Sequence, residues 1–129
     1  MKTKFTVALA LLLVTLLVAC GATSLWDSAT YLTDTTVGNG AKTVTVSVEA
    51  EEKAVTITLK TDKATLGEAL YEQGLINDPS FFDTLNGMKA DWNATKTYWA
   101  FYQGDEYMPV GVNETAIEGG ESYRFVLSK

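Results

Sequence analysis

The residues best suited to recognising a ligand are aromatic, and they gather in one stretch of the sequence. Six of the thirteen aromatic residues that follow the N-terminal apolar run lie between positions 92 and 107. Composition predicts a strand from Thr97 to Gln103. Side chains alternate across a strand, so Trp99 and Phe101 share one face while Tyr98 and Tyr102 share the other.

We interpret these two faces differently. A single cysteine allows no disulfide within the chain, so the core needs large apolar side chains, and we expect the core to contain Trp99, Phe101, Tyr123 and Phe125. The opposite face offers tyrosine rings and hydroxyl groups that suit a flat ligand or a sugar. The candidate ligand-binding residues on this face are Tyr98, Tyr102 and Arg124. An ordinary solvent-facing sheet surface is the alternative, and the residues alone leave it open. Tyr107 and Met108 are added because they follow a turn and precede Pro109, and loop ends commonly carry function. Covering of the sheet edge is the alternative for these two.

Catalytic and metal chemistry find little support in the sequence. The chain has no histidine, which excludes serine and cysteine triads and metal sites built on histidine. The carboxylates show no spacing that selects an acid–base pair. Asp105 with Glu106, or Asp78 with Asp83, offers weak oxygen ligands for Ca²⁺, but a solvated acidic face explains them as well. We expect no enzyme activity, no cofactor and no resident metal.

The N-terminus predicts export and lipid anchoring. Lys2 and Lys4 precede an apolar run from Phe5 to Val18, which is too short to span a bilayer and is typical of a signal peptide. The run ends in Leu-Val-Ala-Cys-Gly, which resembles a bacterial lipobox. We expect residues 1–19 to be the signal peptide and Cys20 to carry lipid on the extracellular face of the membrane. A secretory signal with an incidental cysteine is the alternative.

Loss of the signal peptide leaves 16 acidic and 8 basic residues, so the mature chain is acidic. It has no cluster of lysine and arginine, which argues against nucleic acid and anionic lipid head groups as partners. Residues 20–41 are rich in Thr, Ser, Gly, Asp and Asn, and we interpret them as a flexible tether. Trp26, Tyr31 and Leu32 are its apolar exceptions, and we expect them to belong to an ordinary loop. Docking on the domain or on the cell wall is the alternative.

The remaining residues, 42–129, predict one domain of mixed strands and a helix. Alternation from Thr43 to Val48 and again from Val55 to Leu59 predicts an antiparallel hairpin with its valines buried. Thr65 begins a capping-box pattern for a short helix that stops at Gly74. An Asn-Gly turn at 86–87 joins two extended segments, the second running to Trp92. The order predicts an α+β fold, a β-grasp-like mixed sheet with one short helix on one face.

This order of motifs resembles the transcobalamin-like C-terminal domain family of exported bacterial lipoproteins. The matching features are the valine-rich hairpin, the Thr65-Leu66 helix start, the Asn-Gly turn, the aromatic strand ending at Gly104, and Gly119-Gly120 before the last strand. The chain departs from the family in having Gln103 before the first of these glycine turns and Glu121 after the second. The resemblance covers about residues 42 to 128 and implies a ligand-binding type of fold, with a corrinoid such as cobalamin as a candidate ligand.

The sequence is compatible with two functions. The first is a membrane-anchored extracellular domain that binds a corrinoid or a similar flat ligand. The second is a module that binds a surface transport protein or the cell wall and has no small-molecule ligand.

Overall fold

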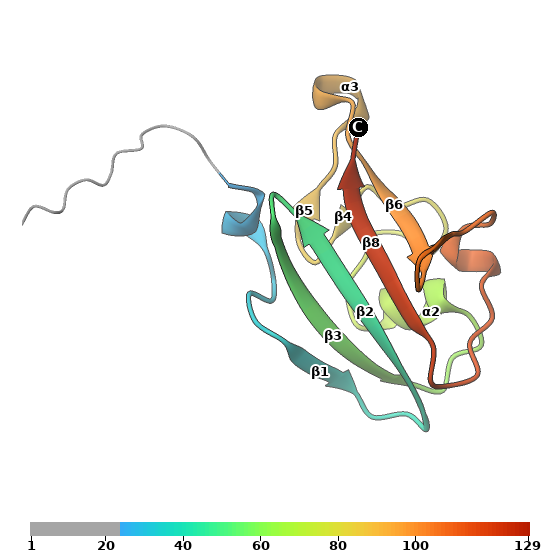
Figure 1. Ribbon diagram of the computed structural model, residues 1–129. Helices are drawn as coiled ribbons and strands as arrows, with labels where there is room; N and C mark the ends of the chain where they lie inside the picture. The colour runs from blue at the N-terminus through green and yellow to red at the C-terminus, as the bar shows by residue number, and fades with distance from the viewer. Residues whose placement is uncertain (1–23) are drawn as a thin grey trace, which may run out of the picture.

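The computed structural model describes residues 24–129, and the predicted signal peptide and Cys20 lie outside the described residues. Figure 1 shows a curved sheet whose strands run from one end of the domain to the other. Within the described part of the chain no helix is long and apolar enough to span a bilayer.

The sheet is built around the predicted hairpin. Strand β2 spans Lys42–Ala50 and pairs antiparallel with β3, Lys53–Thr61. Their inward residues are almost fully buried, as the alternation predicted: Val44, Val46, Val48, Val55, Ile57 and Leu59. The two-residue turn between the strands places Glu51 and Glu52 at positive φ, 52° and 65°. Both residues take the left-handed conformation that a tight hairpin of this kind requires.

Four further strands complete a six-stranded sheet in the order β1-β3-β2-β8-β6-β7. Strand β8 (Ser122–Ser128) lies parallel to β2 and antiparallel to β6 (Tyr98–Gln103). Strand β7 (Glu106–Tyr107) pairs with the end of β6, and β1 (Thr35–Gly38) runs parallel to β3. The first hairpin, the central parallel last strand and the covering helix confirm the predicted α+β, β-grasp-like fold.

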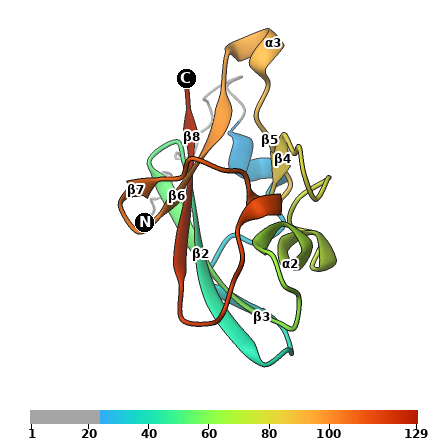
Figure 2. The same cartoon turned by 90° about the vertical axis from the view of Figure 1, so that its right-hand side faces the viewer.

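One face of this sheet is covered and the other is open. Viewed almost edge-on in Figure 2, the sheet carries helix α2 (Leu66–Glu72) and the short hairpin of β4 (Thr84–Leu85) and β5 (Met88–Lys89) on the same side. Leu66, Ala69 and Leu70 of α2 are completely buried in the core. The opposite face carries half-buried hydroxyl side chains of β2 and β3, including Thr45, Ser47, Thr56 and Thr58. A ligand from solvent can therefore reach this open face directly.

Helix α2 begins as the sequence predicted, with one difference in its cap. The Thr65 hydroxyl accepts the Glu68 backbone N–H at 3.3 Å. Glu68 does not reach back to the Thr65 amide; its Oε1 accepts the Thr65 hydroxyl at 3.2 Å instead. Thr65 forms an isolated antiparallel bridge with Ala116, in which the Leu66 N–H donates to the Thr115 carbonyl at 2.9 Å and the Ile117 N–H donates to the Ala64 carbonyl at 3.0 Å. Gly74 follows the helix at φ 72°, as expected of a C-terminal stop.

Part of the segment expected to be a flexible tether is folded onto the domain. A short 3₁₀ helix, η2 (Leu25–Ser28), buries Trp26 to 5% exposure. The Trp26 indole N–H donates to the Ala50 carbonyl at 2.9 Å. Tyr31 packs against the core, whereas Leu32 stays 65% exposed. These apolar residues gave no period because Trp26 contacts the β2–β3 turn and the Tyr31 backbone is bonded to the Asn86 side chain, and no single helix or strand contains both.

The connection after α2 contains the predicted Asn-Gly turn but very short strands. Strands β4 (Thr84–Leu85) and β5 (Met88–Lys89) flank Asn86 and Gly87, which have φ of 55° and 80°. The extended segment expected to reach Trp92 stops early, because Asp91 accepts the Ala94 N–H and begins the four-residue helix α3, Trp92–Thr95. A final 3₁₀ turn, η3 (Val112–Glu114), lies against α2.

Candidate functional site

Arg124 lies near the middle of the open face and is held by a two-point ion pair. Its Nε donates to Glu49 Oε2 at 2.9 Å and its Nη2 donates to Glu49 Oε1 at 3.3 Å. The two side chains meet because β8 and β2 are parallel neighbours in which Arg124 is opposite Ser47. The hydrogen bond from Arg124 lowers the pKa of Glu49 against the opposing effect of burial, and the Ser47 hydroxyl adds to the lowering.

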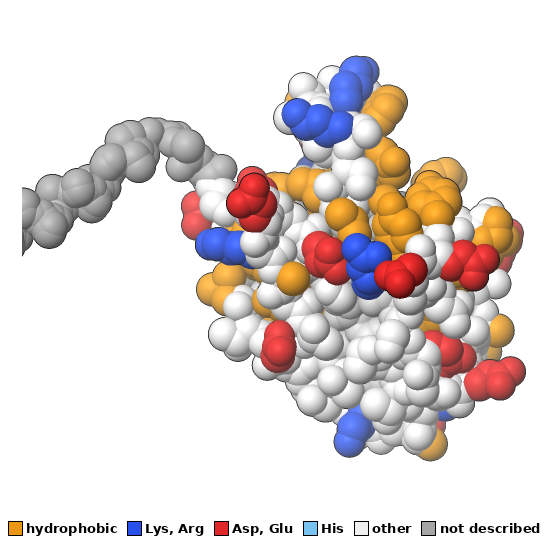
Figure 3. All heavy atoms as spheres, viewed as in Figure 1, with side chains coloured by type: hydrophobic (Ala, Val, Ile, Leu, Met, Phe, Trp, Pro, Cys, Tyr) orange, Lys and Arg blue, Asp and Glu red, His pale blue; other side chains and the backbone are white. Residues whose placement is uncertain are grey.

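Two tyrosines extend this arrangement toward the edge of the sheet. Tyr102 is directly opposite Arg124 on the neighbouring strand, and the guanidinium carbon lies 5.0 Å from the centre of its ring. Tyr107, opposite Tyr102 on β7, meets that ring edge-on with centroids 5.4 Å apart. We call Glu49, Tyr102, Tyr107 and Arg124 the tyrosine–arginine cluster. Figure 3 views this face, where acidic and basic side chains form a row below an apolar area.

The cluster contains three of the five residues predicted to bind a ligand. Tyr102, Tyr107 and Arg124 lie together, and Tyr107 is 59% exposed. Tyr98 shares their face but stands four residues along β6, about 13 Å away at the usual rise of a strand. Met108 is partly buried against the core, where its backbone N–H donates to the Phe101 carbonyl at 3.0 Å. The structure therefore separates Tyr98 and Met108 from the other three.

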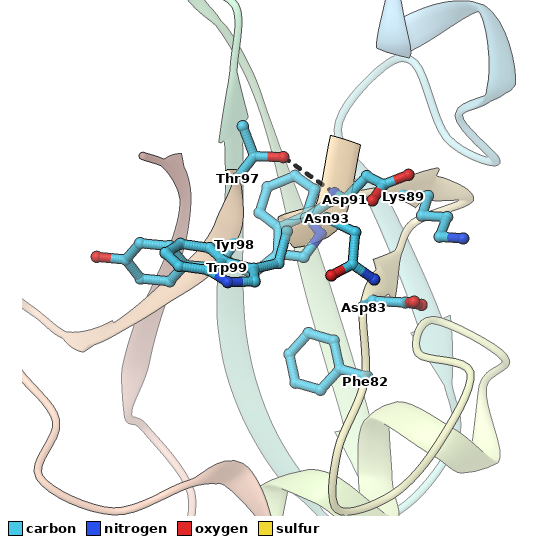
Figure 4. A pocket seen from close by; sticks show the side chains of 10 residues that line it. Phe82, Asp83, Lys89, Asp91, Asn93, Thr97, Tyr98 and Trp99 are labelled. Atoms are coloured by element: carbon cyan, nitrogen blue, oxygen red, sulfur yellow. Dashed lines mark hydrogen bonds between the residues drawn. The ribbon is translucent and has the colours of Figure 1, made fainter. Parts of the chain in front are cut away.

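Tyr98 belongs to a second feature, a hollow of about 320 Å³ at the start of β6. Figure 4 shows Tyr98 and Trp99 on one side of this hollow, with Phe82, Asp83 and Asn93 across from them. Thr97 and Asp91 close its upper edge, where the Thr97 hydroxyl accepts the Asp91 N–H at 3.0 Å. The Trp99 indole N–H is buried in the wall and has no hydrogen-bond partner among residues 24–129.

The hollow was not predicted from the sequence. It forms where the β4–β5 hairpin, α3 and β6 meet, and these segments are joined by turns whose direction no local pattern specifies. Trp92, which is 57% exposed, meets Tyr98 edge-on at 6.3 Å. The one available signal was the Asp91-Trp92-Asn93 sequence, since Asp is a frequent N-cap.

The aromatic residues assigned to the core are confirmed as core. Trp99 and Phe101 are at most 9% exposed, and Tyr123 and Phe125 are at most 1% exposed. Phe101 stacks on Phe125 with centroids 4.9 Å apart. Burial raises the pKa of Tyr123 to about 12, helped by the charge of Glu121, and the Tyr123 hydroxyl has no partner within the described chain.

Three of the four carboxylates considered for Ca²⁺ make contacts within the protein, Asp105 with Arg124 at 3.9 Å and Asp78 and Asp83 with their own loop. Across residues 24–129, no group of three or more His, Cys, Asp and Glu side chains could hold a metal ion. Asp78 instead accepts the backbone N–H groups of Ser80 and Phe81, and these two bonds lower its pKa. Asp83 accepts from Asn77 and Thr84. These carboxylates organise the loop that leads into β4.

Comparison with known proteins identifies the fold and no family. No protein-family model matches the chain, and neither does any curated protein. A crystal structure from Ruminococcus gnavus ATCC 29149, provisionally described as a metal-binding protein, is similar with a TM-score of 0.64 and 23% identity. The match covers 69% of this chain and 98% of that one. At this identity the similarity concerns the fold alone.

Haptocorrin, crystallised in complex with Cbi, is also similar, with a TM-score of 0.47 and 19% identity. That match covers 72% of this chain and 26% of haptocorrin, so the present chain corresponds to about a quarter of that protein.

Proposed function

We propose that this protein is a membrane-anchored extracellular lipoprotein whose β-grasp-like domain binds a ligand and catalyses no reaction. The observation that carries the proposal is the tyrosine–arginine cluster on the open face. It presents an exposed tyrosine ring beside an arginine whose position is already set by Glu49 and Tyr102. A guanidinium held this way loses little conformational freedom when a ligand binds beside it.

The composition of the cluster suits a flat, partly apolar ligand with acceptor groups on its rim. The rings of Tyr102 and Tyr107 supply apolar contact area together with hydroxyl groups. Arg124 supplies donors, and its side chain remains 36% exposed. Glu49 already satisfies two of those donors, so neutral or weakly polar acceptors fit better than a strongly anionic group competing with Glu49.

Corrinoids are the first ligand class to test, because the motif pattern of residues 42–128 resembles the transcobalamin-like domains. An open sheet face contacts such a ligand from one side only and leaves much of its surface in water. We therefore expect a dissociation constant in the micromolar range or weaker, a binding free energy of about −8 kcal/mol or less in magnitude.

The experiment is a calorimetric titration of the domain from Ser24 onward with a corrinoid. Every described contact lies within these residues. Tyr102→Ala should weaken binding by about tenfold, and Tyr71→Ala is the matched control, since Tyr71 is 52% exposed on α2. If no heat of binding is detected at high corrinoid concentration, corrinoids are not the ligand of this domain.

Tyr98→Ala tests the hollow at the start of β6 as the alternative ligand site. Loss of binding in Tyr98→Ala with normal binding in Tyr102→Ala would move the site to the hollow. Its volume of about 320 Å³ is at the lower end for ligand pockets. It would enclose only an edge of a large flat ligand.

Binding of a surface protein or the cell wall, with no small-molecule ligand, is the second candidate function. It is favoured by the exposed rings of Trp92 and Tyr98 beside the hollow, since exposed aromatic side chains are common at interaction sites. Recovery of an exported partner by the parent domain, and its loss with Trp92→Ala, would support this function over the first.

The anchor is tested separately in cells. Replacing Cys20 with Ser should either release the protein or leave its precursor uncut. A Ser variant that remains in the membrane at mature size would contradict the lipid anchor.

A further inference from the structure

The folded body is attached to the N-terminal segment at one end of the sheet. The Ser24 hydroxyl donates to Glu51 Oε1 at 2.7 Å, and Trp26 is fixed to the Ala50 carbonyl. Ala50 and Glu51 lie at the turn between β2 and β3. The chain therefore joins the domain beside this turn, as Figure 1 shows.

Few residues separate this attachment point from the predicted lipid. Ser24 follows Cys20 by four residues in the sequence. At no more than about 3.5 Å per residue, four residues reach at most about 14 Å. A tether of 20 residues would let the domain turn freely above a membrane, whereas four residues hold this end of the sheet close to it.

The same end of the sheet carries helix α3 and the end of the chain. Strand β8 runs parallel to β2 and ends at Ser128, which is opposite Tyr98 at the start of β6. The N-terminal segment also contacts the hairpin that leads into α3, since the Thr30 N–H donates to the Asn86 carbonyl at 2.8 Å. In both cartoon views α3 projects beyond the sheet at this end (Figures 1 and 2).

The side chains at this projection have the chemistry of a membrane interface. Trp92 and Tyr98 are 57% and 40% exposed and touch edge-on. Lys96 Nζ lies 5.3 Å from the centre of the Trp92 ring, and Lys129 follows directly after β8. We call Trp92, Lys96, Tyr98 and Lys129 the tip. Figure 3 shows basic and apolar side chains together at the top of the molecule, where Figure 1 places α3.

We propose that the tip is a membrane-contact surface that lies among lipid head groups when the protein is anchored through Cys20. Tryptophan and tyrosine favour this depth because one part of each ring is apolar and the other is polar. The absence of a lysine cluster in the sequence argued against anionic lipid head groups, but the pairing of Tyr98 with Ser128 puts Lys96 and Lys129 at the same end of the sheet, where they add attraction to such lipids. The inference rests on the proposed lipid anchor and adds the orientation of the domain.

None of the carboxylates at this end belongs to the tip. Asp27 and Glu52 are exposed, in η2 and in the β2–β3 turn. Asp91 is half-buried and caps α3, where it accepts the Ala94 N–H at 3.0 Å. Glu51 is engaged by the Ser24 hydroxyl and the Leu25 N–H. With the tip on the membrane, the tyrosine–arginine cluster stands about 13 Å farther along β6. It therefore stays open to ligands from solution.

The experiment uses chemical anchoring, so that its result does not depend on lipidation in the cell. The chain beginning at Cys20 has a single thiol, which is coupled to a maleimide lipid in vesicles of phosphatidylcholine and phosphatidylglycerol. A matched set of vesicles carries brominated acyl chains, which quench tryptophan fluorescence at contact. Trp26 and Trp99 are at most 8% exposed, so the difference between the parent and Trp92→Phe isolates the signal of Trp92.

We expect strong quenching of Trp92 by the brominated lipid. The control places a tryptophan on α2, as Tyr71→Trp combined with Trp92→Phe, and this probe should be quenched little. Lys96→Gln should lower the ratio of docked to undocked protein by about fivefold, as expected for one lysine near an anionic surface. That loss should disappear in vesicles of phosphatidylcholine alone.

Quenching of Trp92 no greater than that of the α2 probe would overturn the inference and leave the anchor standing. Loss of the anchor is recognised separately by the Cys20→Ser fractionation described above. An unlipidated native protein would overturn the inference as well, even if the chemically anchored chain docks.

Discussion

Arg124 and Glu49 are 75 residues apart in the sequence and form an ion pair at 2.9 Å in the centre of the open face. Nothing in the local sequence pairs them, since each is a charged residue between two buried neighbours in an alternating strand. The parallel pairing of β2 with β8 brings them together, and Tyr102 on β6, the next strand of the sheet, completes the arrangement. This single contact joins the first and last long strands of the domain.

The ion pair predicts an acid-sensitive contribution to stability. The pKa of Glu49 is lower in the folded protein than its ordinary value of 4.5. Its contribution is therefore present above about pH 4.5 and is lost as the pH falls through the folded pKa. Glu49→Gln should lower the free energy of unfolding at neutral pH by less than about 1 kcal/mol, because both side chains are about one third exposed.

Urea denaturation at pH 7 and at about pH 3 checks this prediction. The difference between the parent and Glu49→Gln should shrink at the lower pH. A difference that stays constant between the two pH values would show that Glu49 contributes through packing and not through its charge.

The burial of Trp26 predicts that the N-terminal segment is part of the cooperative fold. Trp26→Ala removes a large buried side chain and the indole bond to Ala50, and should cost about 3 to 5 kcal/mol. Leu32→Ala is the matched control from the same segment, since Leu32 is 65% exposed, and should change stability by less than about 0.5 kcal/mol. Chemical denaturation measures both losses of stability. Equal losses would mean that the N-terminal segment is a flexible tether after all.

The buried face of the first hairpin is tested by a pair of charge substitutions. Val46 has no exposed surface, so Val46→Asp puts an unpaired carboxylate into the core and should prevent folding. Thr58 lies on the other face of the same hairpin and is only half-buried. Thr58→Asp should leave a folded protein by circular dichroism; the reverse outcome would mean that the hairpin is inside out.

The substitution Gly67→Ala in helix α2 sets a gain in helix propensity against a loss from steric overlap. Helix propensity alone predicts that Gly67→Ala stabilises the protein by about 1 kcal/mol. In the structure, an added Cβ would lie 2.5 Å from the Pro79 carbonyl oxygen and 3.2 Å from the Asn113 backbone. Such overlap typically costs 1 to 3 kcal/mol, so we expect net destabilisation. A raised melting temperature would show that the loop at Pro79 yields.

The buried hydroxyl of Tyr123 predicts a stabilising substitution. Tyr123→Phe removes a polar group that has no partner among the described residues, and should stabilise the protein by about 1 kcal/mol at neutral pH. The pKa of Tyr123 is raised from 10.0 to about 12. The folded state therefore holds the phenol proton more tightly than the unfolded state does, and the free energy of unfolding falls as the pH rises above 10.0 and through about 12.

Thermal unfolding across the alkaline range measures this effect. The parent should lose stability more steeply than Tyr123→Phe as the pH rises toward 12. Parallel curves would indicate that the hydroxyl is solvated in the native protein.

The core of the fold could be predicted because it depends on local periodicity. Alternation in β2 and β3 identified the six buried hairpin residues, and the capping pattern at Thr65 identified the start of α2. The N-terminal segment could not be predicted in this way. Trp26 is buried by a turn 24 residues away, and Thr35 to Gly38 become a strand only because β3 offers a free edge.

The candidate site could be predicted only in part for a related reason. The period of two correctly placed Tyr98 and Tyr102 on the same face, away from Trp99 and Phe101. The period did not show that the two tyrosines belong to different features. Tyr98 lies beside the hollow, and the length of β6 separates it from the tyrosine–arginine cluster. Glu49 was missed since its contact with Arg124 depends on strand order.

The sequence by itself determined which face of each long strand is buried, where the helix begins, and that the chain carries the motifs of an exported lipoprotein. These properties follow from residue types at short spacing, which act through local backbone preference and burial. Tertiary structure alone decided which strands are neighbours and which end of the sheet receives the N-terminal segment. Those choices depend on contacts between residues far apart in the chain, and they bring Arg124 to Glu49 and place Trp92 at the same end of the sheet as the point of attachment.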